Sequence, residues 1–454
     1  MRCIKANRTC GGYESAAVFV FRPYEAPGTN ISSKFLSQAR KCSMPTRAPI
    51  PGTDVLSEDI LPAEISQAQS NELALRAFFY DYCIVSTNPN LSRGFLSGLE
   101  MMAHRLGPQS DLAKACQAVA FGSHGKPLNR PQLVAKAEMF HQELLGSLAE
   151  AIENPASANA TEAKLVAMLL GLYQIIVATE SNPGNHVSHA KGLAALMGSG
   201  HSPLSLLSTR QSAYVMSPKT RSQVSGIFSV PALSCQKDSL DDLLLSLDQV
   251  WRKFEASLEL KGLNSLNEEA IQLERRFSRW QDSRNTEFKP TIIGHVSKGR
   301  SGSETAAGYW PGRVDTYFDL YVAGVWNIFR AARLLLIVLI VNLPNTTGDT
   351  DSHIRTANCI VEDMIASIPY HLTDNLPAFL SELATSIEIT DPGRSVGGLL
   401  LMHPLYVASK MPFLPEKVRK YMLTCLSWIG SNMGLGQAGV LATVSGVIIY
   451  QFIS

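Results

Sequence analysis

The feature that most constrains the fold is a long apolar segment at residues 314–342. Its large side chains recur at spacings that place them on one broad face of a helix, and Pro344 would end that helix. The longest uninterrupted apolar run, Leu334 to Val341, has eight residues. A membrane-spanning helix needs about 20. The segment therefore predicts a buried core helix and argues against a membrane protein.

Helical spacing of apolar residues continues along most of the chain from about Ser66. Strand-like alternation is rare, and no period of a regular helical repeat is visible. Thr161 is a candidate N-cap for an almost wholly apolar helix over 163–178. The sequence predicts an all-α protein, with further helices near 112–121, 133–152, 188–197, 241–260, 267–279, 353–368, 375–385, 415–433 and 437–451.

Proline and glycine divide the chain into regions. Residues 15–65 are rich in both, which predicts a flexible, mostly disordered linker. Residues 66–454 form the predicted helical domain, and the hydrophobic content of 45% is ample for a large core. Two soft breaks, near 217–236 and 289–312, are interpreted as loop insertions in that domain, the second as a long mobile loop.

Charge is distributed unevenly. The formal net charge is +1, so overall charge alone does not indicate a binder of polyanions. Residues 1–50 nevertheless carry eight Lys and Arg residues against only Glu14 and Glu25. Such a basic segment fits a remnant that once contacted phosphate, or simply a solvated, flexible chain end.

The eight cysteines show no disulfide framework. Six of them lie at wide, irregular spacing in apolar segments, which predicts buried free thiols in a reducing compartment. The other two, Cys3 and Cys10, are close together with basic residues between them. Thiolates suit zinc, but a zinc site takes four ligands, so these two cannot close one alone.

The start of the chain resembles the end of the binuclear, six-cysteine cluster of fungal zinc-cluster transcription factors. Cys10 is followed by Gly12-Tyr13 and then by Phe21-Arg22, as often in that family. The resemblance makes Cys3 and Cys10 the fifth and sixth cluster ligands and residues 1–14 a remnant of the DNA-binding domain. The first four cysteines and the basic loop that enters the major groove are missing. We therefore expect this chain neither to retain zinc nor to read DNA. An internal start in the gene model and genuine loss both explain the missing part.

The rest of the chain resembles the helical regulatory domain that follows the cluster in these factors. The matching segments, which keep the family's order, are 172–174, 182–184, 189–196, 315–334, 403–408 and 433–438. The resemblance implies a fungal regulator of RNA polymerase II transcription that resides in the nucleus, contacts the transcriptional machinery and forms a possible homodimer. DNA is an implied partner only if the complete cluster is present.

Several polar residues lie in apolar surroundings. Asn327, Arg330 and Arg333 lie on the long apolar segment and must find buried partners, such as helix-end carbonyls or a carboxylate. A structural network is the favoured interpretation, and an acidic effector bound by the arginines is the alternative. His186 and His189 are interpreted as packing or capping residues, and Asp241-Asp242 as an ordinary helix start.

No phosphate-binding loop, nucleophile elbow or paired His–Cys arrangement occurs in the sequence, so we do not expect an enzyme. The leading hypothesis is a transcription regulator with an incomplete zinc cluster. The alternative is a stand-alone helical protein that binds a partner or an effector without DNA.

Overall fold

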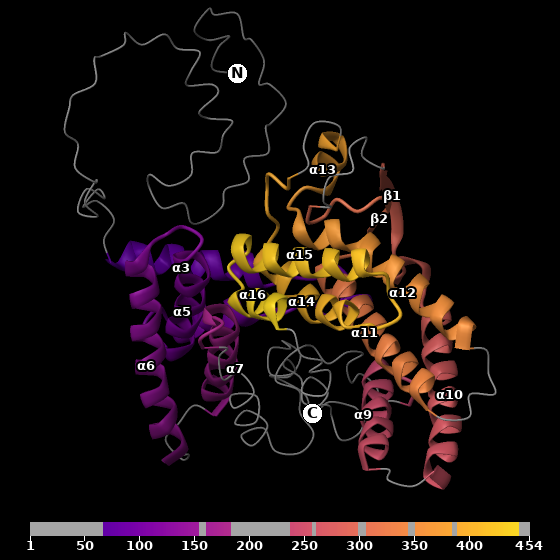
Figure 1. Cartoon of the computed structure of the whole chain (residues 1–454). Helices are drawn as coiled ribbons and strands as arrows, with labels where there is room; N and C mark the ends of the chain where they lie inside the picture. Colours follow the sequence, from indigo (N-terminus) through magenta and orange to yellow (C-terminus); the bar gives the residue numbers. More distant parts are fainter. Residues whose placement is uncertain are drawn as a thin grey trace, which may run out of the picture. The chain divides into compact units, whose positions relative to one another are not determined.

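The computed structural model describes residues 67–153, 160–182, 237–256, 260–297, 306–343, 350–383 and 388–444. Within these ranges the chain forms thirteen α-helices, one short 3-10 helix and two short strands (Figure 1). The prediction of an all-α protein is confirmed. The predicted segments 1–14 and 15–65, the loop near 217–236 and the helix near 188–197 lie outside the described residues.

The chain divides into two compact units, residues 1–80 and 81–454. The described part of the first unit is most of helix α3 (Gln67–Tyr82), where Glu72 and Arg76 form an exposed ion pair one turn apart. An exposed pair of this kind contributes little to stability.

The first helices of the second unit pack against one another. They are α4 (Leu99–Leu106), α5 (Asp111–Gly125), α6 (Pro131–Glu153) and α7 (Ala160–Val177). Helix α5 packs against both α6 and α7. Ser110 caps α5 by accepting a hydrogen bond from the Ala113 amide. Thr161 lies inside the first turn of α7, so it does not precede the helix as predicted.

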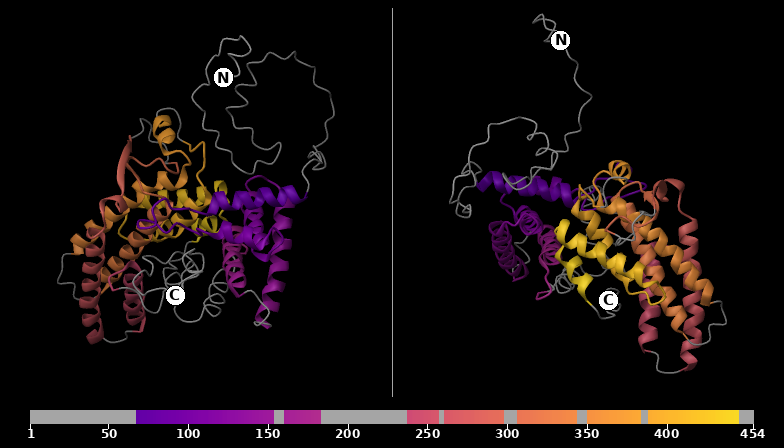
Figure 2. Two further views of the ribbon diagram at one scale, coloured as in Figure 1. Left: turned by 180° about the vertical axis from the view of Figure 1, so that it is seen from behind. Right: turned by 45° about the horizontal axis from the view of Figure 1, so that its top comes forward.

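The remaining helices complete the second unit, with α11 (Leu320–Asn342) as its most buried long helix. They are α9 (Leu240–Ala256), α10 (Leu260–Asp282), α12 (Thr350–Leu372), α13 (Leu376–Glu382), α14 (Ser395–Ser409), α15 (Glu416–Asn432) and α16 (Gly436–Thr443). Helix α11 contacts α9, α10, α12 and α14, and α9 and α10 run side by side (Figure 2). All residues of α11 from Tyr321 to Ile340 are buried except Ile328.

Helix α11 is long and apolar enough to cross a membrane by length and composition, but 83% of its apolar window is buried within the protein. Its apolar surface is therefore already covered by neighbouring helices. This is the expected position of a core helix.

The predicted loop over 289–312 is wrong at both ends. Strand β1 (Thr291–Val296) pairs antiparallel with β2 (Gly312–Thr316), and a bulge interrupts the ladder between Ile292 and Gly294. One face of the pair packs on α12 and α13 through Val296, Val314 and Phe379. The β-branched residues and this apolar support favour strands despite the surrounding glycines.

The core helix also begins later than predicted. Residues 314–316 belong to β2, and α11 starts after Asp319, whose backbone is extended. The Asp319 carboxylate accepts a hydrogen bond from the Val322 amide at 2.8 Å, which satisfies one of the free amides of the first turn.

We expect the substitution Asp319→Ala to lower the free energy of unfolding by about 1 kcal/mol, because it removes this N-cap from the central helix. Urea denaturation of both proteins measures the change. Asp319→Asn is the matched variant, since its side-chain oxygen can still accept the amide hydrogen bond. A loss as large for asparagine as for alanine would contradict the capping role.

Candidate functional site

Arg333 of α11 has a carboxylate partner, one of the two kinds of partner that the sequence predicts. Arg333 donates from Nε to Glu274 Oε1 of α10 at 2.8 Å, and its Nη2 lies 2.6 Å from the same oxygen. Its Nη1 donates to Gln281 at 3.0 Å. Burial raises the pKa of Glu274, and the hydrogen bond and charge of Arg333 oppose that rise. The guanidinium is thus occupied by α10, which removes Arg333 as a ligand for an acidic effector.

Asn327 connects α11 to α12. Its amide nitrogen donates to Ser367 Oγ at 3.0 Å and lies 3.0 Å from His371 Nε2. Ser367 in turn donates to the Met364 carbonyl at 2.6 Å. Asn327 and Ser367 are fully buried, so these bonds satisfy groups that water cannot reach. The structural network predicted for this residue is confirmed.

His371 connects the same cluster to α14. Its Nδ1 lies 3.0 Å from the carbonyl oxygen of Gly397. Because Nε2 faces the amide donor of Asn327, the hydrogen-bond network assigns the proton to Nδ1, which donates to Gly397. Burial lowers the pKa of His371 to about 4, although the hydrogen bond to Gly397 works in the opposite direction. The imidazole is therefore neutral at physiological pH.

The close approach at this point depends on the glycine. A Cβ atom at position 397 would lie 2.2 Å from the backbone oxygen of His371. No real Cβ contact is that short, so any other residue would push α14 away from α12.

Arg330 has neutral partners. Its Nη1 donates to the Tyr317 hydroxyl and to Asn327 Oδ1, both at 2.9 Å. The guanidinium also lies 5.7 Å from the Trp326 ring centroid, within the range of a cation–π contact. It forms no ion pair with any residue that the structure describes.

Two carboxylates act on Tyr317 as well. Arg313 of β2 pairs with Asp315 at 3.1 Å and also with Asp363 of α12. The two acids hold the pKa of Arg313 above its usual range, against the effect of burial. Because one arginine meets two carboxylates, this triad carries one net negative charge. That charge and the positive charge of Arg330 both act on the buried Tyr317 hydroxyl.

The hydrogen bonds of Asn327, Arg330 and His371 form one buried polar network that joins α11, α12, α14 and Tyr317, which follows β2. Its groups hold each other in fixed geometry, which specifies a single packing arrangement. The sequence indicated Asn327, Arg330 and Arg333 but not their partners Glu274, Ser367, His371 and Gly397. Those partners carry no local signal, because only the packing of the helices brings them to α11.

The neutral histidine predicts a pH dependence of stability. The folded pKa of about 4 lies below the unfolded value of about 6.5, so the unfolded chain binds the proton more tightly. Stability is thus fully present above pH 6.5 and is lost as the pH falls towards 4, by about 3 kcal/mol in total.

Urea denaturation at a series of pH values tests this, with His371→Gln as the comparison. The variant should be less stable at pH 7 but should show a flatter dependence between pH 6.5 and 4. Equal slopes for the two proteins would show that another group carries the acid sensitivity.

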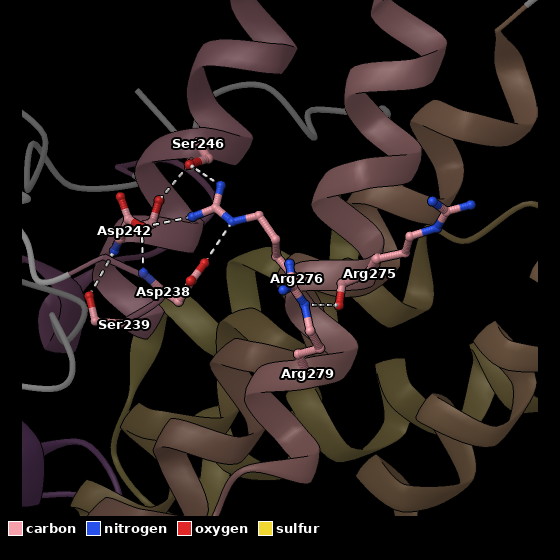
Figure 3. Close-up of polar contacts among 7 residues, drawn as sticks. All are labelled: Asp238, Ser239, Asp242, Ser246, Arg275, Arg276 and Arg279. Carbon is pink, nitrogen blue, oxygen red and sulfur yellow. Dashed lines mark hydrogen bonds and ion pairs between the residues drawn. The ribbon is translucent and has the colours of Figure 1, made fainter.

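A second polar cluster joins α9 to α10 near the surface (Figure 3). Arg276 donates to Asp238 at 2.8 Å and to Asp242 at 2.7 Å, and it also reaches Ser246. Asp242 lies in the first turn of α9, and its backbone amide donates a hydrogen bond to Ser239 Oγ. The interpretation of Asp241-Asp242 as a helix start is confirmed, and Asp242 has the additional role of an interhelical ion-pair partner.

The described cysteines do not provide a zinc site. Burial raises the pKa of Cys83 and of Cys425 to about 12 and raises that of Cys116 as well. Burial thus disfavours the thiolate form of these cysteines, which is the form that binds zinc. Three of the four described cysteines are buried free thiols as predicted, and Cys359 is exposed. Within the ranges that the structure describes, no three His, Cys, Asp or Glu side chains gather as metal ligands. Cys3, Cys10, His186 and His189 lie outside those ranges.

A comparison with curated proteins gives a clear relative. The chain is 46% identical over 397 residues to transcription factor dbaG of Emericella nidulans, an alignment that covers 85% of this chain and 94% of the relative. The chain belongs to this family of fungal transcription factors. No family model matches the sequence, and no solved structure matches it.

Several segments that resembled the regulatory domain of such factors can be placed in the structure. Residues 172–174 lie near the end of α7, and residues 315–334 run from β2 into α11. Residues 403–408 lie in α14, and residues 433–438 run from the turn after α15 into the first residues of α16. In this member of the family, two of the four segments therefore contribute directly to the polar network or to the helices that form it.

Proposed function

We propose that this chain is a nuclear regulator of RNA polymerase II transcription in which the helical body is the regulatory domain. The observation that carries the proposal is the identity with a named transcription factor over most of both chains. The protein acts by binding rather than by catalysis. The described contacts of the polar network support this, because its side chains bond to one another and to backbone carbonyls and none positions a nucleophile next to a base.

The regulatory step is a change in helix packing. Helices α11, α12 and α14 are joined by directional polar contacts, so their arrangement has few alternatives. A ligand or partner that binds one arrangement better than another would shift the population of the domain. The buried network supplies the discrete contacts that such a shift would break or remake.

For the sequence as printed, the proposal includes an incomplete zinc cluster. Cys3 and Cys10 supply two of the four ligands that a zinc ion takes, and the buried cysteines of the body are protonated. If a complete cluster were bound, zinc would fix the fold of the DNA-reading segment. The 454-residue chain is therefore expected to purify without stoichiometric zinc and to show no specific DNA retention.

Zinc analysis and a gel-shift assay on the 454-residue chain test this expectation. One mole of tightly bound zinc per chain would contradict the incomplete cluster. In-frame codons upstream of Met1 provide an independent check, since a cysteine codon directly before it, preceded by three more, would restore the six-cysteine family pattern.

Regulation itself is tested by fusing the full chain to an unrelated DNA-binding domain in a fungal host that carries a reporter gene. A change in reporter transcription relative to the DNA-binding domain alone is the expected result. No change, together with stable association with another protein, would favour the stand-alone interaction protein.

A further inference from the structure

Strands β1 and β2 form a strand pair, residues 291–296 and 312–316, that packs on α12 and α13 (Figure 1). Its apolar support is a small cluster, in which Val296 and Val314 meet Phe379. A two-stranded sheet is only marginally stable by itself. The strand pair therefore depends on its polar contacts to remain in place on the helices.

Arg313 of β2 provides a charged contact to α12. Its guanidinium bridges Asp363 of that helix and Asp315 of its own strand. The side chains of Arg313 and Asp363 are 36% and 34% exposed, whereas that of Asp315 is 1% exposed. Loss of Arg313 would leave Asp315 as a buried carboxylate without a cation, which is strongly unfavourable. Asp315 regains water only if β2 leaves the helices, so Arg313 stabilises the closed position of the strand pair.

Tyr317, two residues after Asp315, connects β2 to the core helix. Its hydroxyl accepts a hydrogen bond from Arg330 Nη1 at 2.9 Å, and its carbonyl accepts one from the Tyr370 hydroxyl at 3.2 Å. Tyr317 is 7% exposed and Arg330 is 2% exposed, so both groups depend on protein partners. A displacement of β2 would therefore break or strain the contact with Arg330.

Charge links the same two sites. The triad carries one net negative charge, and Arg330 carries one positive charge. Burial raises the pKa of Tyr317, Arg330 lowers it, and the two carboxylates of the triad raise it. Both charges thus act on one buried hydroxyl. Arg330 also donates to Asn327, whose amide contacts α12, so a change at the triad reaches the buried network.

We propose that the strand pair is a latched switch: Arg313 holds it closed on α12, and its opening is transmitted through Tyr317 and Arg330 to the packing of α11, α12 and α14. The strand pair would then be the element that drives the change in helix packing, a use that rests on the proposed function. The coupling itself is a property of the fold and is tested on the purified full chain.

The latch senses ionic strength. Part of the pair between Arg313 and Asp363 is exposed, so salt weakens its attraction. The wild-type strand pair should therefore open more at about 1 M than at about 0.01 M NaCl. In Arg313→Gln the remaining carboxylates repel each other, so salt should close the strand pair instead.

Hydrogen–deuterium exchange of the full chain, measured by mass spectrometry, is the test. Arg313→Gln should speed exchange in 291–296 and 312–316 by about tenfold, and in 364–371 and 395–399 by about threefold. Arg313→Lys keeps a cation between the carboxylates and should stay close to wild type. Arg252→Gln, which breaks an exposed ion pair within α9, is the control and should leave the strand pair unchanged.

Tyr317→Phe tests the route of transmission. The substitution removes the hydroxyl that Arg330 contacts, so it should loosen 364–371 and 395–399 while the latch stays in place. Adding Arg313→Gln should then open the strand pair without loosening those two segments further, because the link between them is already lost.

Unchanged exchange in the strand pair of Arg313→Gln would overturn the latch, as would equal salt responses of this variant and the wild type. Opening of the strand pair without faster exchange in 364–371 and 395–399, or additive effects in the double variant, would overturn the transmission. Faster exchange in α5 as well would mean general destabilisation and would also contradict the proposal. The reporter assay is independent of these measurements, so the switch and the proposed function can fail separately.

Discussion

Replacing Arg333 with alanine should lower the free energy of unfolding by about 3–5 kcal/mol. The side chains of Arg333 and Glu274 are only 11% and 12% exposed, so the substitution leaves a nearly buried carboxylate without its cation. Gln281 loses its hydrogen bond to the same guanidinium. Urea denaturation at pH 7 measures the loss, which should shrink at lower pH as Glu274 becomes protonated.

Arg276→Ala is the matched control. Arg276 of α10 also forms an ion pair with a neighbouring helix, but it lies at a more exposed position. The Arg276 side chain is 24% exposed and its partner Asp238 is 49% exposed. We expect a loss of about 1 kcal/mol or less there. Equal losses at the two sites would contradict the assignment of Arg333 to a buried pair.

The double substitution Arg333→Met with Glu274→Leu separates burial from pairing. Apolar residues of similar volume leave no unpaired charge, so most of the stability lost in Arg333→Ala should return. A double variant as unstable as the single one would mean that the pair holds α10 and α11 together through its hydrogen bonds.

The central helix shows how far the sequence alone could go. Its apolar length predicts burial whatever the neighbours are, and this was confirmed. Its start was misplaced because Val314 fits both a strand and a helix over so short a range. The Asp319 cap was a usable signal, since an aspartate before an apolar run marks a helix start.

Helix α14 shows what local pattern could not reveal. It contains Pro404 and two adjacent glycines, Gly397 and Gly398, which disfavour a helix by intrinsic preference. It is also buried along almost its whole length, so no amphipathic period marks it. Burial against α11, α12 and α15 outweighs the propensities.

For the buried polar side chains of α11, too, one part could be predicted from the sequence and another could not. Buried arginines and an asparagine on an apolar helix must have partners, so their structural role could be predicted from the sequence. The identity of those partners could not. Glu274 lies 59 residues from Arg333, and His371 lies 44 residues from Asn327, so only the packing of the helices brings them together.

The substitution Gly397→Ala should destabilise the protein by about 3 kcal/mol or more, because the added methyl group meets backbone rather than a movable side chain. The contact would be 2.2 Å from the His371 oxygen and 3.2 Å from its carbonyl carbon. Relief requires α14 to move away from α12, which also lengthens the hydrogen bond from His371 Nδ1 to the Gly397 carbonyl. Urea denaturation measures the loss.

Gly146→Ala is the matched control within the same chain. Gly146 lies inside α6 with no atom within 4 Å of an added Cβ, so alanine should stabilise the helix there by about 0.5–1 kcal/mol. Opposite signs at the two glycines are the expected result. A neutral Gly397→Ala would mean that α14 can shift without loss, and the network would then not fix the packing of α11, α12 and α14. In the reporter assay, the expected displacement of α14 should alter transcription at temperatures where the variant remains folded, whereas Gly146→Ala should not.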